Sequence, residues 1–260
     1  MTMSSFDTRI IYSNNQLGEV ICQLRFPEIL SIETTLPAAF QDAIRDIFPR
    51  YRVTRETAAP QLMGKPGAMQ VKPQEQTNNY QFATEDGIWR VNLTSKFISL
   101  STNRYSRWED FAAMLDKPLA AFIQIYKPAC FDRVGLRYLN FISRKALELE
   151  DTPFRDLIQP AYVGILGQEI PEGAVTRSGV DGEFIIGGGC KCKLHAGPGK
   201  VTIGGNADPE VKFIIDMDLF TTDKVPVNYS AGALQTLHSQ AFGIFRSAIT
   251  EQLHEAMQPQ

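Results

Sequence analysis

Residues 18–27 read GEVICQLRFP, and this short stretch sets the pattern for the fold. Apolar side chains occupy alternate positions from Val20 to Phe26, which predicts a β-strand with one buried face. Pro27 cannot donate a ladder hydrogen bond and therefore ends the strand. Residues 36–48 then place apolar side chains at helical spacing. The first unit of the chain is therefore a strand followed by a helix.

The same reasoning predicts further elements along the chain. Alternating apolar residues predict strands over 51–57, 80–102, 131–142, 183–195, 200–206 and 211–220, with Gly197-Pro198-Gly199 as a turn. Apolar stripes at helical spacing predict helices over 107–126 and 231–257. In the first of these helices, Ser106 and Glu109 have the spacing of a capping box. Pro118 predicts a kink or a restart capped by Asp116.

These elements predict an α+β fold with antiparallel sheets and packed helices. We expect two similar-sized lobes, an N-terminal strand–helix–strand lobe over 1–148 and a C-terminal lobe of antiparallel strands plus a long helix over 149–260. A strand followed by a helix occurs at 18–48 and again at 97–126, which suggests a duplicated unit. Residues 58–79, rich in Pro, Gly and Gln, predict a protease-sensitive loop.

Composition points to the cytoplasm. The chain has 43% hydrophobic residues, and charges break every apolar run before it could cross a bilayer. Residues 1–15 lack the basic start and apolar core of a secretion signal. Four cysteines, at 22, 130, 190 and 192, are too few for a disulfide framework and are expected to be reduced. We therefore expect a cytoplasmic protein with no membrane contact.

Charge is distributed unevenly. Residues 89–144 carry nine Lys or Arg and four Asp or Glu, whereas residues 145–260 carry nine and fifteen. A basic segment inside an acidic protein is typical of an anion-binding face. It is equally typical of two parts of a chain that pair with each other. The sequence leaves both interpretations open.

Several blocks together resemble a known family. They are WRVNLTSKFISLSTNRYSRWEDF, FDRVGLRYLNFI, FIIDMD and LHSQAFGIFRSAIT, together with the N-terminal GEVICQLRFP. In this order they are similar to a sporadically distributed prokaryotic family of uncharacterised proteins of about this length. The resemblance implies no catalytic residues. A patchy distribution is common among antiviral defence and toxin–antitoxin modules, so it implies a role of that kind.

The strongest candidate site lies in the basic segment. Guanidinium groups and a helix N-terminus suit phosphate or carboxylate, and neighbouring aromatic rings could stack on bases. The candidate anion-binding residues are Arg104, Tyr105, Arg107, Trp108, Arg133 and Arg137. The alternative is that these arginines pair with acidic residues of the C-terminal part.

Other candidate motifs are weaker. Cys190, Cys192 and His195 lack a fourth ligand and diverge on a strand, so we expect no metal ion and no cofactor. Asp216 and Asp218 share one strand face, which could hold a divalent cation but is more typical of a solvated edge strand. His238 falls in the apolar stripe of the last helix, where a packed core histidine is expected.

Three functions follow from these observations. The first is a non-catalytic binding or regulatory protein that contacts a protein partner encoded nearby, or a second copy of itself, in a defence or toxin–antitoxin-like module. The second is a nucleic-acid or nucleotide binder that uses the basic segment 89–144. The third is a metal-dependent hydrolase or transferase that uses Asp216, Asp218 and His238. We favour the first.

Overall fold

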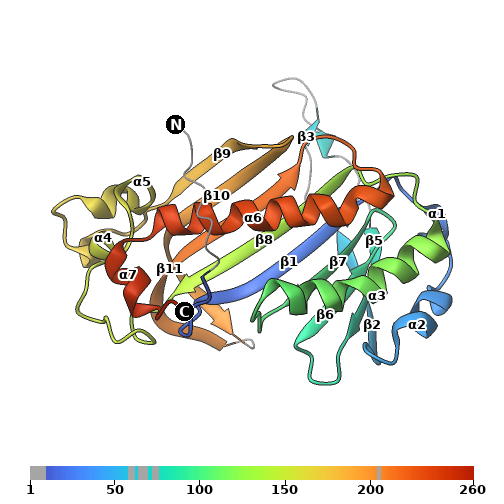
Figure 1. Ribbon diagram of the computed structural model, residues 1–260, viewed down its shortest axis with the longest axis horizontal. Helices are drawn as coiled ribbons and strands as arrows, with labels where there is room; N and C mark the ends of the chain where they lie inside the picture. The colour runs from blue at the N-terminus through green and yellow to red at the C-terminus, as the bar shows by residue number, and fades with distance from the viewer. Residues whose placement is uncertain (1–9, 58–61, 64–69, 72–75, 204–205) are drawn as a thin grey trace.

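The computed structural model describes residues 10–57, 62–63, 70–71, 76–203 and 206–260. Its main strands are β1 (Leu17–Arg25), β2 (Arg50–Thr57), β5 (Gln76–Ala83), β6 (Trp89–Leu93), β7 (Phe97–Thr102), β8 (Arg133–Ile142), β9 (Val180–Gly187), β10 (Cys190–Ile203) and β11 (Asn206–Thr221). They form one antiparallel sheet in the order β2-β5-β6-β7-β1-β8-β11-β10-β9 (Figure 1). Two short strands, β3 (Leu62–Met63) and β4 (Gln70–Val71), pair separately. The predicted α+β class with an antiparallel sheet is confirmed.

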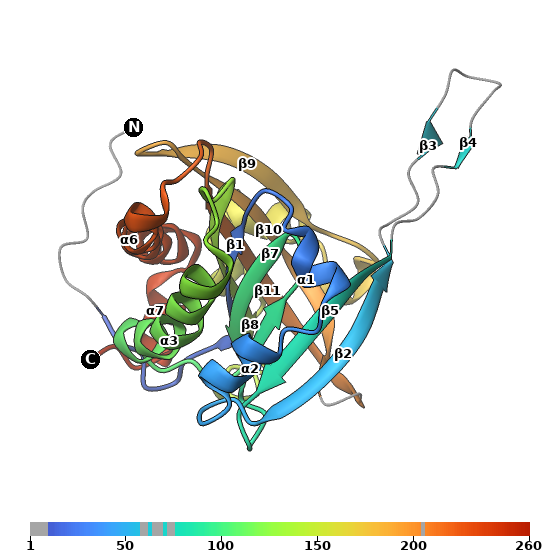
Figure 2. The same ribbon diagram turned by 90° about the vertical axis from the view of Figure 1, so that its right-hand side faces the viewer.

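The helices pack against one face of this sheet. They are α1 (Leu30–Thr34), α2 (Ala38–Ile44), α3 (Trp108–Tyr126), α4 (Phe154–Leu157), α5 (Pro160–Val163), α6 (Ser230–Ala248) and α7 (Glu251–Ala256), with 3-10 turns η1 (Gly164–Gly167), η2 (Glu172–Ala174) and η3 (Val227–Tyr229). The two long helices, α3 and α6, both lie across the same face (Figures 1 and 2). Within the described residues, none of the helices is both long and apolar enough to cross a bilayer.

Strands β1 and β8 pair at the middle of the sheet, with Val20 opposite Tyr138. On one side of this pair lie β7, β6, β5 and β2, and on the other lie β11, β10 and β9. Each side has the same order along the chain: a central strand, short helices, a run of antiparallel strands and one long helix. The sheet continues across residue 148, because β8 pairs with β11. The two lobes and the duplication remain predictions.

Both long helices differ from the expected form. Helix α3 runs unbroken through Pro118, so the predicted restart at Asp116 is wrong. The last helix, by contrast, is interrupted: α6 ends at Ala248, and α7 begins after Thr250. The Thr250 side chain accepts a hydrogen bond from the Leu253 N–H and caps the new helix. The single helix predicted over 231–257 is therefore two helices.

The turns between β9, β10 and β11 also differ from the prediction. Strand β10 continues without interruption through residues 197–199, where the sequence predicts a turn. Pairing with β9 ends at Ala196, so Pro198 lies where β10 has only one neighbour, a position that tolerates proline. The turn lies instead at residues 187–189, where three glycines adopt φ values of 92°, 58° and 69°. The predicted loop 58–79 falls mostly outside the described residues; its described parts are the short strands β3 and β4 and the start of β5 at Gln76.

Alternation along each strand separates two faces. We call the face that packs against α3 and α6 the helix face, and the opposite one the outer face. On β8, the buried side chains of Val134, Leu136 and Tyr138 point to the helix face, whereas Arg133 and Arg137 point to the outer face. This separation places the candidate residues of the sequence on two different surfaces.

Candidate functional site

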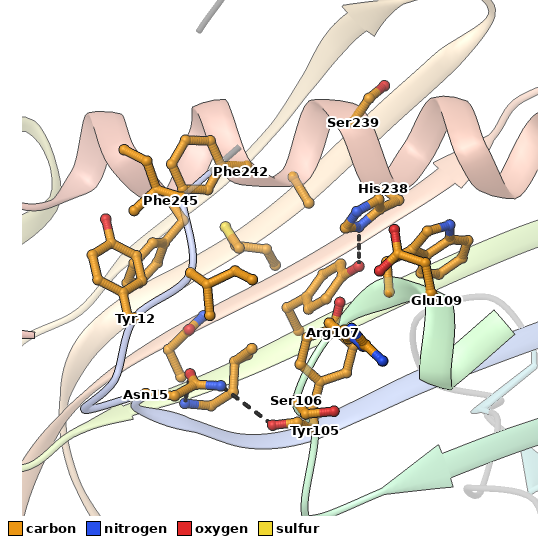
Figure 3. Close-up of a pocket in the computed structure, with 18 of the residues that line it drawn as sticks. Tyr12, Asn15, Tyr105, Ser106, Arg107, Glu109, His238, Ser239, Phe242 and Phe245 are labelled. Atoms are coloured by element: carbon orange, nitrogen blue, oxygen red, sulfur yellow. Dashed lines mark hydrogen bonds between the residues drawn. The ribbon is translucent and has the colours of Figure 1, made fainter. Parts of the chain in front are cut away.

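A cavity of about 350 Å³ lies on the helix face. It is enclosed by α6, the N-terminal end of α3, the segment 10–17 and the central strands of the sheet (Figure 3). Strands β8 and β11 build its floor, because alternation directs Tyr138, Asn140 and Met217 toward the helices. All three floor residues are buried, so the cavity reaches the core of the protein.

One end of the cavity is formed by a stack of aromatic rings. The Trp108 indole lies parallel to the His238 imidazole, with ring centroids 4.5 Å apart and planes 10° apart. Trp108 Nε1 donates to Oε1 of Gln235 at 2.8 Å, which joins α3 to α6. His238 Nδ1 and the Tyr138 hydroxyl form a hydrogen bond of 2.9 Å (Figure 3). These contacts fix the orientation of each ring in the wall.

The Tyr138 hydroxyl remains protonated at neutral pH. Burial raises the pKa of Tyr138 well above 10, and the neighbouring Tyr105 raises it further. The phenol is therefore a neutral hydrogen-bonding group and not a titrating one in the ordinary pH range. This part of the cavity is suited to holding a ligand in position.

The rim at this end is polar. Arg107 Nε donates to Asp110 at 3.0 Å, and the Ser106 hydroxyl donates to the same carboxylate at 2.7 Å. These two donors lower the pKa of Asp110, so its charge persists. The Ser106 hydroxyl is therefore hydrogen-bonded to the Asp110 side chain and does not cap α3, so the predicted capping box is wrong. The exposed Glu109 completes the polar rim.

The other end of the cavity is apolar. Phe242, Phe245 and Met257 line it from the C-terminal side, and Ile10 and Tyr12 line it from the N-terminal side (Figure 3).

Hydrogen bonds hold the N-terminal segment in place over this end. The Tyr12 hydroxyl bonds to Nδ1 of His254 at 2.9 Å. The Ser13 N–H donates to the Gln258 carbonyl at 3.1 Å. The cavity thus has one polar and one apolar end.

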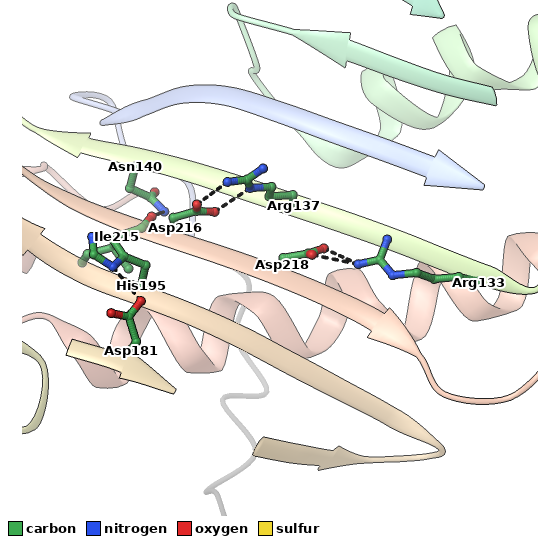
Figure 4. Close-up of polar contacts among 8 residues, drawn as sticks. All are labelled: Arg133, Arg137, Asn140, Asp181, His195, Ile215, Asp216 and Asp218. Atoms are coloured by element: carbon green, nitrogen blue, oxygen red, sulfur yellow. Dashed lines mark hydrogen bonds and ion pairs between the residues drawn. The ribbon is translucent and has the colours of Figure 1, made fainter. Parts of the chain in front are cut away.

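The structure divides the six predicted anion-binding residues between two surfaces. Tyr105, Arg107 and Trp108 line the cavity. Arg104 is exposed next to it, and its backbone N–H donates to the Thr102 hydroxyl at 3.2 Å. The remaining two residues, on β8, lie on the outer face (Figure 4). The six residues therefore do not form a single site.

The two outer-face arginines are ion-paired with β11. Arg137 Nε donates to Asp216 at 2.7 Å, and this carboxylate raises the pKa of the guanidinium. Arg133 donates to both oxygens of Asp218, at 2.7 and 2.8 Å (Figure 4). A Cβ atom on Gly135 would lie 2.2 Å from the Arg133 guanidinium, so the missing side chain gives that group its path across the strand. The alternative that these arginines pair with the acidic C-terminal part holds for both.

The other candidate motifs are also separated. Asp216 and Asp218 lie on the outer face of β11, an inner strand, so the expected edge-strand position is wrong. His238 lies on the helix face, so the three residues proposed for hydrolysis do not meet.

On β10, Cys190 and Cys192 are buried, whereas His195 is exposed and bonds Asp181 at 2.9 Å. Among the described residues, His, Cys, Asp and Glu form no group of three or more that could hold a metal ion.

Sequence reasoning missed most of the cavity. Tyr138 and Asn140 were within a predicted strand, and the signal was present: Asn140 is a polar residue on the apolar face. The contribution of Tyr12 carried no such signal, because residues 10–15 show no periodicity.

Comparisons of the sequence with known proteins do not assign the chain to a family. No family model matches it, and no curated protein matches it.

Proposed function

We propose that the protein is a non-catalytic binding protein that holds a small amphipathic organic molecule in the cavity between α3 and α6. The observation that carries this proposal is a cavity, partly open to solvent, with an apolar end at Phe242 and Phe245 and a polar rim at Arg107 and Glu109. Ligand sites are typically concave, lined by aromatic groups and furnished with a few fixed polar atoms. The apolar part of the ligand would lie near Tyr12 and the polar part near Gln235.

The size of the cavity fits this proposal. A volume of about 350 Å³ falls at the lower end of the range of about 300–1,000 Å³ found for ligand pockets. The hydrogen bonds of Trp108 and Tyr138 hold their rings in fixed orientations, which reduces the entropy that binding must overcome. A small, rigid ligand is favoured over a long flexible chain.

The cellular setting stays a proposal that rests on the family resemblance. A cytoplasmic binding protein in a prokaryotic defence or toxin–antitoxin-like module could respond to such a ligand and contact a protein partner. Binding of nucleic acid by residues 89–144 has less support. Arg107, Arg133 and Arg137 of that segment already pair with carboxylates, which reduces the charge available for phosphates.

The test is to fill the cavity. Ala241 of α6 is buried and lines the cavity, so Ala241→Phe places a ring inside it. The probe is 8-anilinonaphthalene-1-sulfonate, which joins an apolar ring system to an anionic group. We expect the variant to bind the probe about tenfold or more weakly, because the ring occupies the space of the ligand.

The control is Thr236→Phe, which adds the same ring at an exposed position of α6. It should bind the probe as the wild type does. Both variants should keep a cooperative thermal transition. Equal probe fluorescence in all three proteins would overturn the proposal, because the probe would then bind elsewhere.

A further inference from the structure

One polar atom in the cavity floor lacks a hydrogen-bond donor among the described residues. Asn140 is 3% exposed, and its Nδ2 donates to the Ile215 carbonyl at 3.1 Å (Figure 4). No other described side chain or backbone group donates a hydrogen bond to its Oδ1 atom. The atom can be reached from the cavity, so either water or a ligand can supply the donor there.

The sheet fixes the orientation of this amide. Asn140 and Ile215 are directly opposite each other in the β8–β11 ladder. The backbone carbonyl of Ile215 can accept a hydrogen bond from the NH2 group of the Asn140 amide but not from its oxygen. The amide therefore cannot rotate by half a turn without losing that bond. Since Asn140 lines the cavity and its Nδ2 is held by β11, Oδ1 is the acceptor that it can present to a ligand.

The surroundings of the acceptor favour a flat ring. Tyr138 lies two residues before Asn140 on the same face of β8. The Tyr105 ring packs edge-on against the Tyr138 ring, with ring centroids 6.1 Å apart. Met217 lies next to them on the floor. Aromatic rings and a thioether provide favourable faces and edges for another aromatic ring. The Tyr138 hydroxyl is engaged by His238.

We propose that the ligand is a planar nitrogen heteroaromatic compound whose N–H group donates a hydrogen bond to Oδ1 of Asn140. This inference rests on the proposed function, because it requires that the cavity binds a small molecule. The ring lies against Tyr138 and Met217, and the polar rim receives any charged substituent. Asn140 then selects for the N–H group, since an analogue without it leaves the amide oxygen unpaired.

The test compares two probes of nearly the same shape, indole and indene. Indene has a CH2 group in place of the ring N–H and is the more apolar of the two. A purely apolar cavity would therefore bind indene more tightly. Selection by Asn140 reverses this order, and we expect indole to bind the wild-type protein about tenfold more tightly. Binding is measured by titration followed by NMR or calorimetry.

Two variants identify the residue responsible. In Asn140→Leu the acceptor is gone, so indene should bind at least as tightly as indole. The control is Met217→Leu, which changes the shape of the same floor without removing the acceptor and should keep the preference for indole. The comparison on the wild-type protein needs no variant, so a preference for indene there overturns the inference even if Asn140→Leu does not fold.

The outcomes separate the two proposals. If neither probe nor the naphthalene sulfonate binds, the proposed function is wrong. If the probes bind but indene is preferred, the cavity is a ligand site and the role of Asn140 is wrong. A preference for indole that persists in Asn140→Leu also overturns the inference, because another group then supplies the acceptor.

Discussion

Strand β8 has two faces that use polar residues in opposite ways. On the outer face, Arg133 and Arg137 pair with carboxylates of β11, so the charge of each guanidinium is balanced by a protein group. On the helix face, Asn140 binds β11 with one end of its amide and presents the other end to a cavity. Both arrangements depend on the same ladder between β8 and β11.

The difference separates structural polar groups from functional ones. A polar side chain whose partners are all supplied by the protein contributes to stability or to the specificity of folding. One whose remaining hydrogen-bonding capacity faces a cavity is available to a ligand. Substitutions on the outer face should therefore change stability without changing binding, whereas substitutions on the helix face at the cavity should change binding.

The largest effect is expected from Arg133→Ala. This guanidinium is 19% exposed, its partner Asp218 is 31% exposed, and it also lies 4.5 Å from the centre of the Phe220 ring. Removing it leaves a half-buried carboxylate unpaired and should lower the free energy of unfolding by about 2 kcal/mol. Urea unfolding measures the change.

A control for this prediction is Arg25→Ala, in which an exposed arginine loses only a hydrogen bond to Gln23. It should change stability by less than about 0.5 kcal/mol. Binding of 8-anilinonaphthalene-1-sulfonate should be unchanged in both variants. A loss of binding in Arg133→Ala with unchanged stability would contradict the division between the two faces.

The next effect is the pH dependence of stability that comes from the buried thiol of Cys192, whose pKa is also raised by two carboxylates of the outer face. Burial raises the pKa of the Cys192 thiol from 9.0 to about 12, and the charges of Asp218 and Asp216 add to this. The unfolded thiol ionises near pH 9 and the folded one near pH 12, so the stability that Cys192 contributes is full below pH 9 and is lost as the pH rises toward 12.

We expect wild-type protein to lose on the order of 1 kcal/mol more than Cys192→Ala between pH 7 and pH 10. Comparing the two proteins at both pH values removes the cost of the smaller side chain, which is the same at each pH. An identical loss in both proteins would show that the thiol is accessible to solvent.

The smallest effect is expected from Arg137→Ala. This side chain is 44% exposed, although its partner Asp216 is only 18% exposed. The exposed end of the pair is screened by water, so the expected loss of stability is under about 1 kcal/mol. A larger loss than in Arg133→Ala would reverse the order that exposure predicts. Thermal unfolding in low and high salt tests this, since screening should remove most of the effect.

The local elements could be predicted from the sequence because each depends on periodicity. The alternation in residues 18–26 and 131–142 gave β1 and β8 within two residues at each end. The break at Thr250 was missed because the apolar stripe continues through it, and a cap is recognised only by its partner, Leu253. The turn at 197–199 was wrong because Gly and Pro are also tolerated where a strand has lost one neighbour.

The candidate site could be predicted only in part. Tyr105, Arg107 and Trp108 were identified from one continuous stretch, and all three line the cavity. Their grouping with Arg133 and Arg137 was wrong because those two residues lie on the opposite face of the sheet, although they belong to the same basic segment of the sequence. Which face of β8 meets which helix depends on the order of the strands, and that order joins residues a hundred positions apart, such as Tyr138 and His238.

The central position of β1 has a consequence for synthesis on the ribosome. β1 is made before the other strands of this sheet, yet its two neighbours, β7 and β8, begin only at Phe97 and Arg133. At about 5–20 residues per second, its two edges and the apolar face of Val20, Cys22 and Leu24 stay uncovered for several seconds. Residues 17–25 therefore leave the ribosome well before either of the strands that pair with them has been made.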